Sequence, residues 1–107
     1  MLTSKQISYL RSLSVNEPDI IYVGKEGVTG EVIGQARDAL EARELVKGKV
    51  QKTALESPLE AAQAIAEVIH CDVVCTIGSK FILYKRNNKN PKIELPSKAK
   101  KKAALKK

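Results

Sequence analysis

Two glycines, Gly24 and Gly27, are the residues of this chain whose types and spacing most clearly predict ligand chemistry. They follow an apolar run at residues 20–23 and precede a helix start at Thr29, so a strand, a loop and a helix N-terminus should meet there. Loop N–H groups and the positive end of a helix dipole both favour an anion. Lys25 adds an ammonium group, and glycine lets a ligand approach the backbone closely. The pattern predicts a phosphate contact.

The same loop has a plainer interpretation. Short glycine-bearing connections are common in α/β units, and the glycines could serve only the turn. From the residues alone, the two interpretations weigh about equally. Glu26 places a negative charge in the loop, which opposes phosphate binding unless Lys25 reaches further. A dinucleotide site of the Rossmann type is disfavoured because the sequence lacks Gly-x-Gly-x-x-Gly.

No set of side chains predicts catalysis. Cys71 and Cys75 have no third or fourth partner for zinc, and we interpret them as buried, reduced thiols. The lone His70 ends a predicted helix, where a polar cap is favourable, and no Ser, Cys or carboxylate is placed to complete a site with it. We therefore expect no enzyme activity, no catalytic residue, no metal and no cofactor.

The elements that must position the loop are predicted from hydrophobic periodicity and from helix caps, which include Thr3 with Gln6 and Ser57 with Glu60. Strands that are joined through a helix run parallel, and the last two strands should form a hairpin. The order α-β-α-β-α-β-β then predicts an α/β chain of the two-layer α+β type, with a small mixed four-stranded sheet and packed helices. Gly48, inside one strand, predicts a bulge or loose packing. The expected helices cover residues 4–13, about 30–44 and 58 to about 70, and the strands cover 20–23, 45–52, 71–77 and 80–85.

Further basic residues fall on the predicted helices and strands. Taken singly, each is most simply a solvated surface residue, and lysines at a sheet edge also oppose aggregation. Taken together with the loop, they could form a stripe that follows a phosphate backbone. With only four aromatic residues, the chain favours recognition of backbone and shape over the stacking of bases. The candidates for the stripe are Lys5, Arg11, Arg37, Lys47, Lys49 and Lys80.

The net charge of +7 is concentrated at one end of the 107 residues. Residues 85–107 carry ten Lys or Arg against one Glu, whereas residues 1–84 carry a net charge of −2. We interpret residues 1–96 as one domain and 97–107 as a basic, disordered tail that binds any polyanion. No apolar run approaches the roughly 18 residues of a membrane span, and the first residues lack the apolar core of a signal peptide. We expect a cytoplasmic protein without a membrane partner.

Three sequence blocks resemble the YhbY family, which is built on the chloroplast RNA splicing and ribosome maturation (CRM) domain. The blocks are GKEGVT at 24–29, ALEARELVK at 39–47 and IELP at 93–96, and the likeness covers about residues 2–96. The resemblance implies a fold similar to the C-terminal domain of translation initiation factor three. It also implies a non-enzymatic bacterial RNA-binding protein.

The expected partner is rRNA in the precursor of the large ribosomal subunit, a pre-ribosomal particle, with the protein itself a monomer. The resemblance places rRNA backbone contacts at the glycine loop, which comprises Gly24, Lys25, Glu26, Gly27 and the following Thr29. A protein-interaction adaptor whose basic tail alone binds nucleic acid is the alternative.

Overall fold

The computed structural model describes residues 2–86, and their elements follow the order α-β-α-β-α-β-β. The predicted order and the α+β class are confirmed, and each predicted boundary lies within two residues of the observed one. The helices are α1 (Ser4–Ser14), α2 (Gly30–Arg43) and α3 (Pro58–Ile69), and the strands are β1 (Asp19–Val23), β2 (Leu45–Val50), β3 (Asp72–Ile77) and β4 (Lys80–Tyr84). The predicted tail at 97–107 lies outside the described residues.

Local side-chain hydrogen bonds explain where the helices begin and end. Thr3 and Ser57 open α1 and α3 with reciprocal capping boxes, which satisfy backbone N–H groups that have no partner inside a helix. Thr29 caps α2, because its Oγ1 accepts a hydrogen bond from the N–H of Val32 at 3.3 Å. His70 adopts the left-handed conformation (φ 57°) that ends α3, so its predicted place at the helix end is confirmed.

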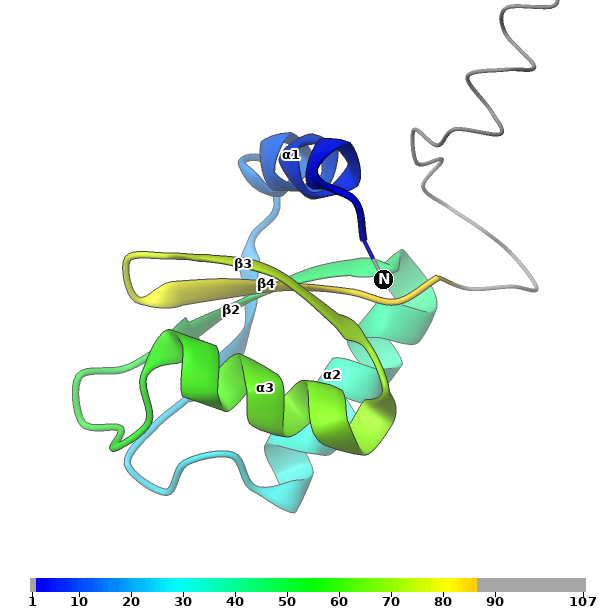
Figure 1. The fold of residues 1–107 in the computed structure, drawn as a ribbon. Helices are drawn as coiled ribbons and strands as arrows, with labels where there is room; N and C mark the ends of the chain where they lie inside the picture. Colours follow the sequence, from blue (N-terminus) through cyan, green and yellow to red (C-terminus); the bar gives the residue numbers. More distant parts are fainter. Residues whose placement is uncertain (1, 87–107) are drawn as a thin grey trace, which may run out of the picture.

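The sheet has the strand order β1-β2-β4-β3. β1 and β2 are parallel, and β4 runs antiparallel to both β2 and β3. The connection through α3 therefore skips one position, and β4 fills it by returning as the second strand of a hairpin. Figure 1 shows α2 and α3 beneath the sheet and α1 above it. The two-layer description thus holds for the α2–α3 side, and α1 adds a partial third layer on the opposite face.

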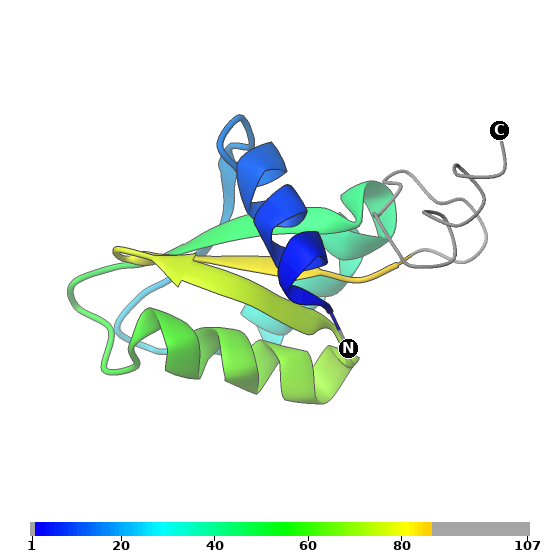
Figure 2. The same cartoon turned by 45° about the horizontal axis from the view of Figure 1, so that its top comes forward.

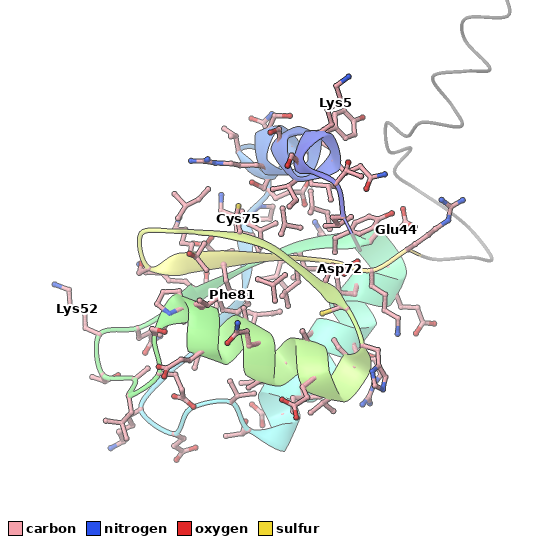
Figure 3. The ribbon with its side chains drawn as sticks, viewed as in Figure 1. Lys5, Glu44, Lys52, Asp72, Cys75 and Phe81 are labelled. Carbon is pink, nitrogen blue, oxygen red and sulfur yellow. The ribbon has the colours of Figure 1, made fainter. Side chains whose placement is uncertain are left out.

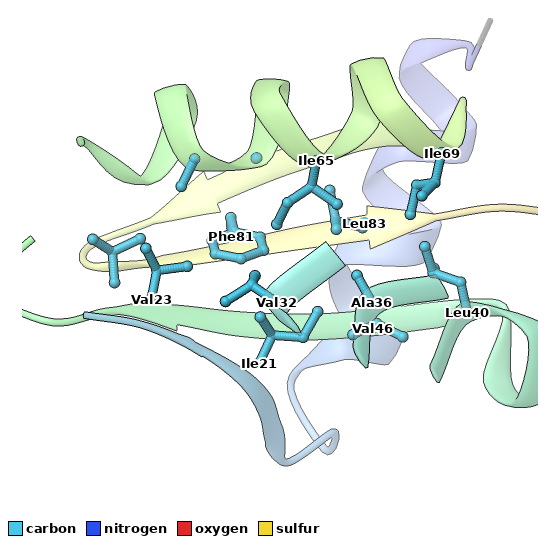
Figure 4. Packing of buried hydrophobic residues seen from close by; sticks show 13 residues of the cluster. Ile21, Val23, Val32, Ala36, Leu40, Val46, Ile65, Ile69, Phe81 and Leu83 are labelled. Atoms are coloured by element: carbon cyan, nitrogen blue, oxygen red, sulfur yellow. The ribbon is translucent and has the colours of Figure 1, made fainter. Parts of the chain in front are cut away.

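Two hydrophobic cores follow from this arrangement. The larger core lies between the sheet and the α2–α3 layer, where Phe81 shares one buried cluster with Val23, Val32 and Ile65 (Figure 4). The smaller core lies under α1 and is centred on Leu10, which is completely buried. The sheet is therefore held from both faces, and the loops at its edges are positioned by buried strands.

Gly48 shows that a glycine can be required inside a strand. The prediction of loose packing at Gly48 is wrong, because an added Cβ would lie only 2.3 Å from Cζ of Phe81. The aromatic ring occupies the space that a side chain would need. The pairing with β1 does shift register next to Gly48: Asp19 and Ile21 of β1 oppose Lys47 and Gly48, so the extra residue of the irregularity lies in β1.

Candidate functional site

The loops after β1 and β2 leave the same edge of the sheet, because these two strands are parallel. We call this edge the carboxyl edge; its loops are residues 24–29 and 51–57, which lie side by side in Figures 1 and 2. The N–H of Gln51 donates to the carbonyl oxygen of Val23 at 2.8 Å and ties the two loops together at their bases. Ligands of sheets with parallel strands bind preferentially outside such an edge.

The glycine loop forms a tight turn at this edge. The N–H of Gly27 donates to the carbonyl oxygen of Gly24 at 2.9 Å, and Gly27 has a φ of +75°, which glycine adopts without steric cost. We call this segment the Gly24–Gly27 turn. Its central residues, Lys25 and Glu26, are exposed at the tip. At least Gly27 thus serves the turn itself, and the turn presents one positive and one negative side chain to solvent.

The carboxylate of Glu56, from the neighbouring loop, fills the inner side of this turn. A Cβ added at Gly27 would lie 2.5 Å from Oε2 of Glu56, and the same oxygen accepts a hydrogen bond from the N–H of Val28 at 3.4 Å. One N–H group that was predicted to be available for a phosphate is therefore already used, and Gly27 itself is buried. The accessible side of the turn is the outer one, where Lys25 lies.

Three more lysines surround the carboxyl edge. Lys49 and Lys80 are cross-strand partners on β2 and β4, and Lys52 extends outward from the 51–57 loop (Figure 3). Lys80 also forms an ion pair with Oδ2 of Asp19 at 3.2 Å, which offsets part of its charge. Lys52 is absent from the set that was predicted from the sequence, because its loop adjoins the loop of Lys25 only through the parallel pairing of β1 and β2.

The other predicted basic residues do not join a single stripe. Lys5 and Arg11 lie on α1, on one side of the sheet, whereas Arg37 lies on α2, on the other side. Lys47 is half-buried, and its Nζ donates to the carbonyl oxygen of Ser14 at 3.1 Å. This contact caps the C-terminus of α1, where carbonyl groups lack intrahelical donors. The structure gives Lys47 a structural contact and separates Lys5 and Arg37 into opposite layers.

Thr29 also has a structural contact, because its hydroxyl oxygen is the N-cap of α2. Its position still brings the positive end of the α2 dipole next to the Gly24–Gly27 turn. The helix start and the turn are adjacent in the chain, as the sequence predicts.

The two cysteines are free and half-buried. Burial raises the pKa of Cys71 to about 11, with a further increase from the Asp72 charge, and burial also raises the pKa of Cys75. Both side chains are therefore protonated thiols at neutral pH, the unreactive form. Within residues 2–86 no group of three or more His, Cys, Asp or Glu is arranged to hold a metal ion. No helix in the same range is long and apolar enough to span a membrane.

These features define the class of the molecule: a small α+β domain with a lysine-rich, glycine-bearing edge that suits an anionic ligand. The model of the CRS1/YhbY (CRM) domain matches residues 2–85. The chain belongs to this family, which confirms the resemblance seen in the sequence blocks.

Individual relatives and a solved structure agree with this assignment. The chain is 42% identical to "Probable RNA-binding protein YqeI" of Bacillus subtilis, with 90% of this chain and 100% of that protein covered. It is 32% identical to a protein of Haemophilus influenzae named "RNA-binding protein", with 91% and 97% covered. The solution structure of the hypothetical protein SAV1595 from Staphylococcus aureus superposes with a TM-score of 0.76 at 40% identity, with 90% of this chain and 100% of that one covered.

Proposed function

We propose that this protein binds RNA without catalysing a reaction, and that the carboxyl edge of the sheet contacts the RNA backbone. One observation carries the proposal: Lys25 and Lys52 belong to the two loops of the carboxyl edge, and Lys49 and Lys80 are cross-strand partners at the ends of β2 and β4 that adjoin it. Relatives over almost the whole chain bear the name of RNA-binding proteins, and phosphate is the anion that RNA presents repeatedly.

The chemistry of this edge favours contacts to phosphates over the reading of bases. Lysine is a compact charge without a fixed hydrogen-bonding plane, so it attracts phosphates without distinguishing sequences. Glu26 and Glu56 lie within the same loops and reduce the net positive potential. We therefore expect moderate affinity, little sequence preference and a strong dependence on salt concentration.

A variant truncated after Pro96 tests the proposal against the adaptor alternative. We expect it to retain RNA binding in fluorescence anisotropy, with weaker affinity and a smaller salt dependence than the full chain, because lysines beyond Pro96 are removed. Circular dichroism of the same sample checks the fold. Complete loss of RNA binding by a folded, truncated chain would favour an adaptor whose tail alone binds nucleic acid.

We further propose that the bound RNA is rRNA of the large-subunit precursor in the bacterial cytoplasm, and that the protein acts as a monomer. The membership of the family and the sequence blocks of the YhbY type support this proposal. Gradient fractionation of a cell extract tests it directly. The protein should migrate with precursors of the large subunit, and nuclease treatment should move it to the top of the gradient. Migration at the top without nuclease treatment would contradict the proposal.

A further inference from the structure

One part of the sheet face on the α1 side is not covered by α1. The helix packs over Leu45, Val74, Ile82 and Tyr84. In both Figure 1 and Figure 2 the end of the sheet that carries the β3–β4 turn extends past the helix. That uncovered end adjoins the carboxyl edge, because the N–H of Val50 donates to the carbonyl oxygen of Ser79 in the turn at 2.8 Å.

The strand register places one residue from each strand in a row across this uncovered end. Tyr22 pairs with Lys49, Lys49 pairs with Lys80, and Lys80 pairs with Ile77. We call these four residues the Tyr22 row. Cross-strand partners have their side chains on the same face of a sheet, about 5 Å apart. Tyr22 and Ile77 are therefore separated by two lysines on one continuous surface.

The exposure of this row distinguishes it from an ordinary sheet face. Tyr22 is 51% exposed and Ile77 is 40% exposed, whereas Tyr84 on the same face is 3% exposed beneath α1. Arg11, from the last turn of α1, lies near β3: burial raises the pKa of Cys75, and the Arg11 charge opposes that rise. An exposed aromatic ring thus lies beside Lys49, in a row that carries a second lysine and ends near Arg11.

An aromatic ring flanked by lysines fits a nucleotide better than it fits an apolar protein surface. A base stacks on the ring, and the phosphates on either side of that base contact the ammonium groups. The two contacts require a strand whose bases are unpaired, because bases inside a duplex do not present their faces. Tyr22 and Lys49 lie at the ends of β1 and β2 that lead into the loops of Lys25 and Lys52, which favours a chain of phosphates over an isolated anion.

We propose that the Tyr22 row binds single-stranded RNA, with one base stacked on Tyr22 and the adjoining phosphates on Lys49 and Lys80. This inference rests on the proposed RNA-binding function and adds a base contact next to the phosphate contacts of the loops. The proposal modifies the expectation, drawn from the low aromatic content, that RNA is recognised without base stacking. One exposed tyrosine is enough for one stacked base. Lys80 would share its charge between Asp19 and a phosphate.

The first test compares Tyr22→Ala with Tyr22→Phe for binding to a short single-stranded RNA. Loss of the ring should weaken binding about five- to a hundredfold, and Phe should retain the affinity because stacking needs only the ring. Tyr9→Ala is the matched control, since Tyr9 is 38% exposed on α1 and lies outside the row. If the wild type binds and Tyr22→Ala binds equally well, the inference is overturned while the proposed function stands. If the wild type itself does not bind RNA, the proposed function fails as well.

The second test separates stacking from simple attraction to a polyanion. An oligonucleotide of the same length with abasic riboses should bind wild type and Tyr22→Ala equally, because neither can stack a base on it. An equal loss of affinity for both oligonucleotides on Tyr22→Ala would overturn the stacking assignment. Since the chain contains no Trp, Tyr22→Trp also introduces a single fluorescent reporter. Its emission should be quenched by the base-bearing RNA and not by the abasic one.

Discussion

Replacement of Gly48 by Val should lower the free energy of unfolding by about 3 kcal/mol or more, a large fraction of the total stability of a small domain. An added Cβ at this position would lie 2.3, 2.7 and 2.9 Å from three carbons of the Phe81 ring. The ring is completely buried and cannot move away without displacing the larger core. The result runs against the general preference of strands for Val over Gly. Urea denaturation, monitored by far-UV circular dichroism, measures the free energy of unfolding of the variant and of wild type.

Two further variants make this prediction specific. Gly34→Ala, inside α2, adds a Cβ with no atom within 4 Å and should raise the free energy of unfolding by about 0.5–1 kcal/mol. Phe81→Leu should reduce the cost of Gly48→Val when the two are combined, because the clash involves the ring. Equal stability of Gly48→Val and wild type would contradict the packing described for this strand.

Reversal of two loop charges should have the largest effect on RNA binding. We expect Lys25→Glu combined with Lys52→Glu to weaken RNA affinity about ten- to a hundredfold at physiological salt, because two attractive charges become repulsive in the loops of the carboxyl edge. The slope of log Kd against log salt concentration should fall by about 0.7 for each lost phosphate contact on single-stranded RNA. Fluorescence anisotropy across a salt series gives both values.

The matched control for this variant is Lys5→Glu, which changes the net charge in the same direction. Figure 3 shows Lys5 on α1 and Lys52 at the far end of the molecule. A local site predicts a much smaller loss for Lys5→Glu than for Lys25→Glu. Equal losses for the two single variants would mean that RNA responds only to overall charge, and the carboxyl edge would lose its special role.

The features that were predicted correctly from the sequence depend on residues close together in the chain. The capping boxes at Thr3 and Ser57 each involve residues three apart, and the periodicity of a helix or strand extends over a few turns or alternations. The turn at Gly24 and Gly27 is equally local. These signals are sufficient for the element order and for the position of the candidate loop.

The features that were missed depend on contacts between distant residues. Gly48 is required because of Phe81, Lys47 contacts the end of a helix at Ser14, and Glu56 fills the turn at Gly27. No local pattern marks any of these pairs. The register of β2 against β4 would have revealed the Gly48–Phe81 contact, because it places these two residues directly opposite each other.

The position of Lys52 and the Tyr22 row likewise require the sheet topology. The loop of Lys52 adjoins that of Lys25 only when β1 and β2 are known to be parallel neighbours, and the Tyr22 row requires the register of all four strands. Composition alone counts Tyr22 as one of few aromatic residues, whereas the structure shows that α1 leaves it exposed.

The most direct test of the central claim is an NMR titration of the ¹⁵N-labelled full-length protein with a short single-stranded RNA. Binding at the carboxyl edge predicts the largest amide shifts in the Gly24–Gly27 turn and around Lys49 and Lys52, with small shifts at the start of α1 and in α3. Shifts confined to residues 87–107, with the Gly24–Gly27 amides unmoved, would contradict the account.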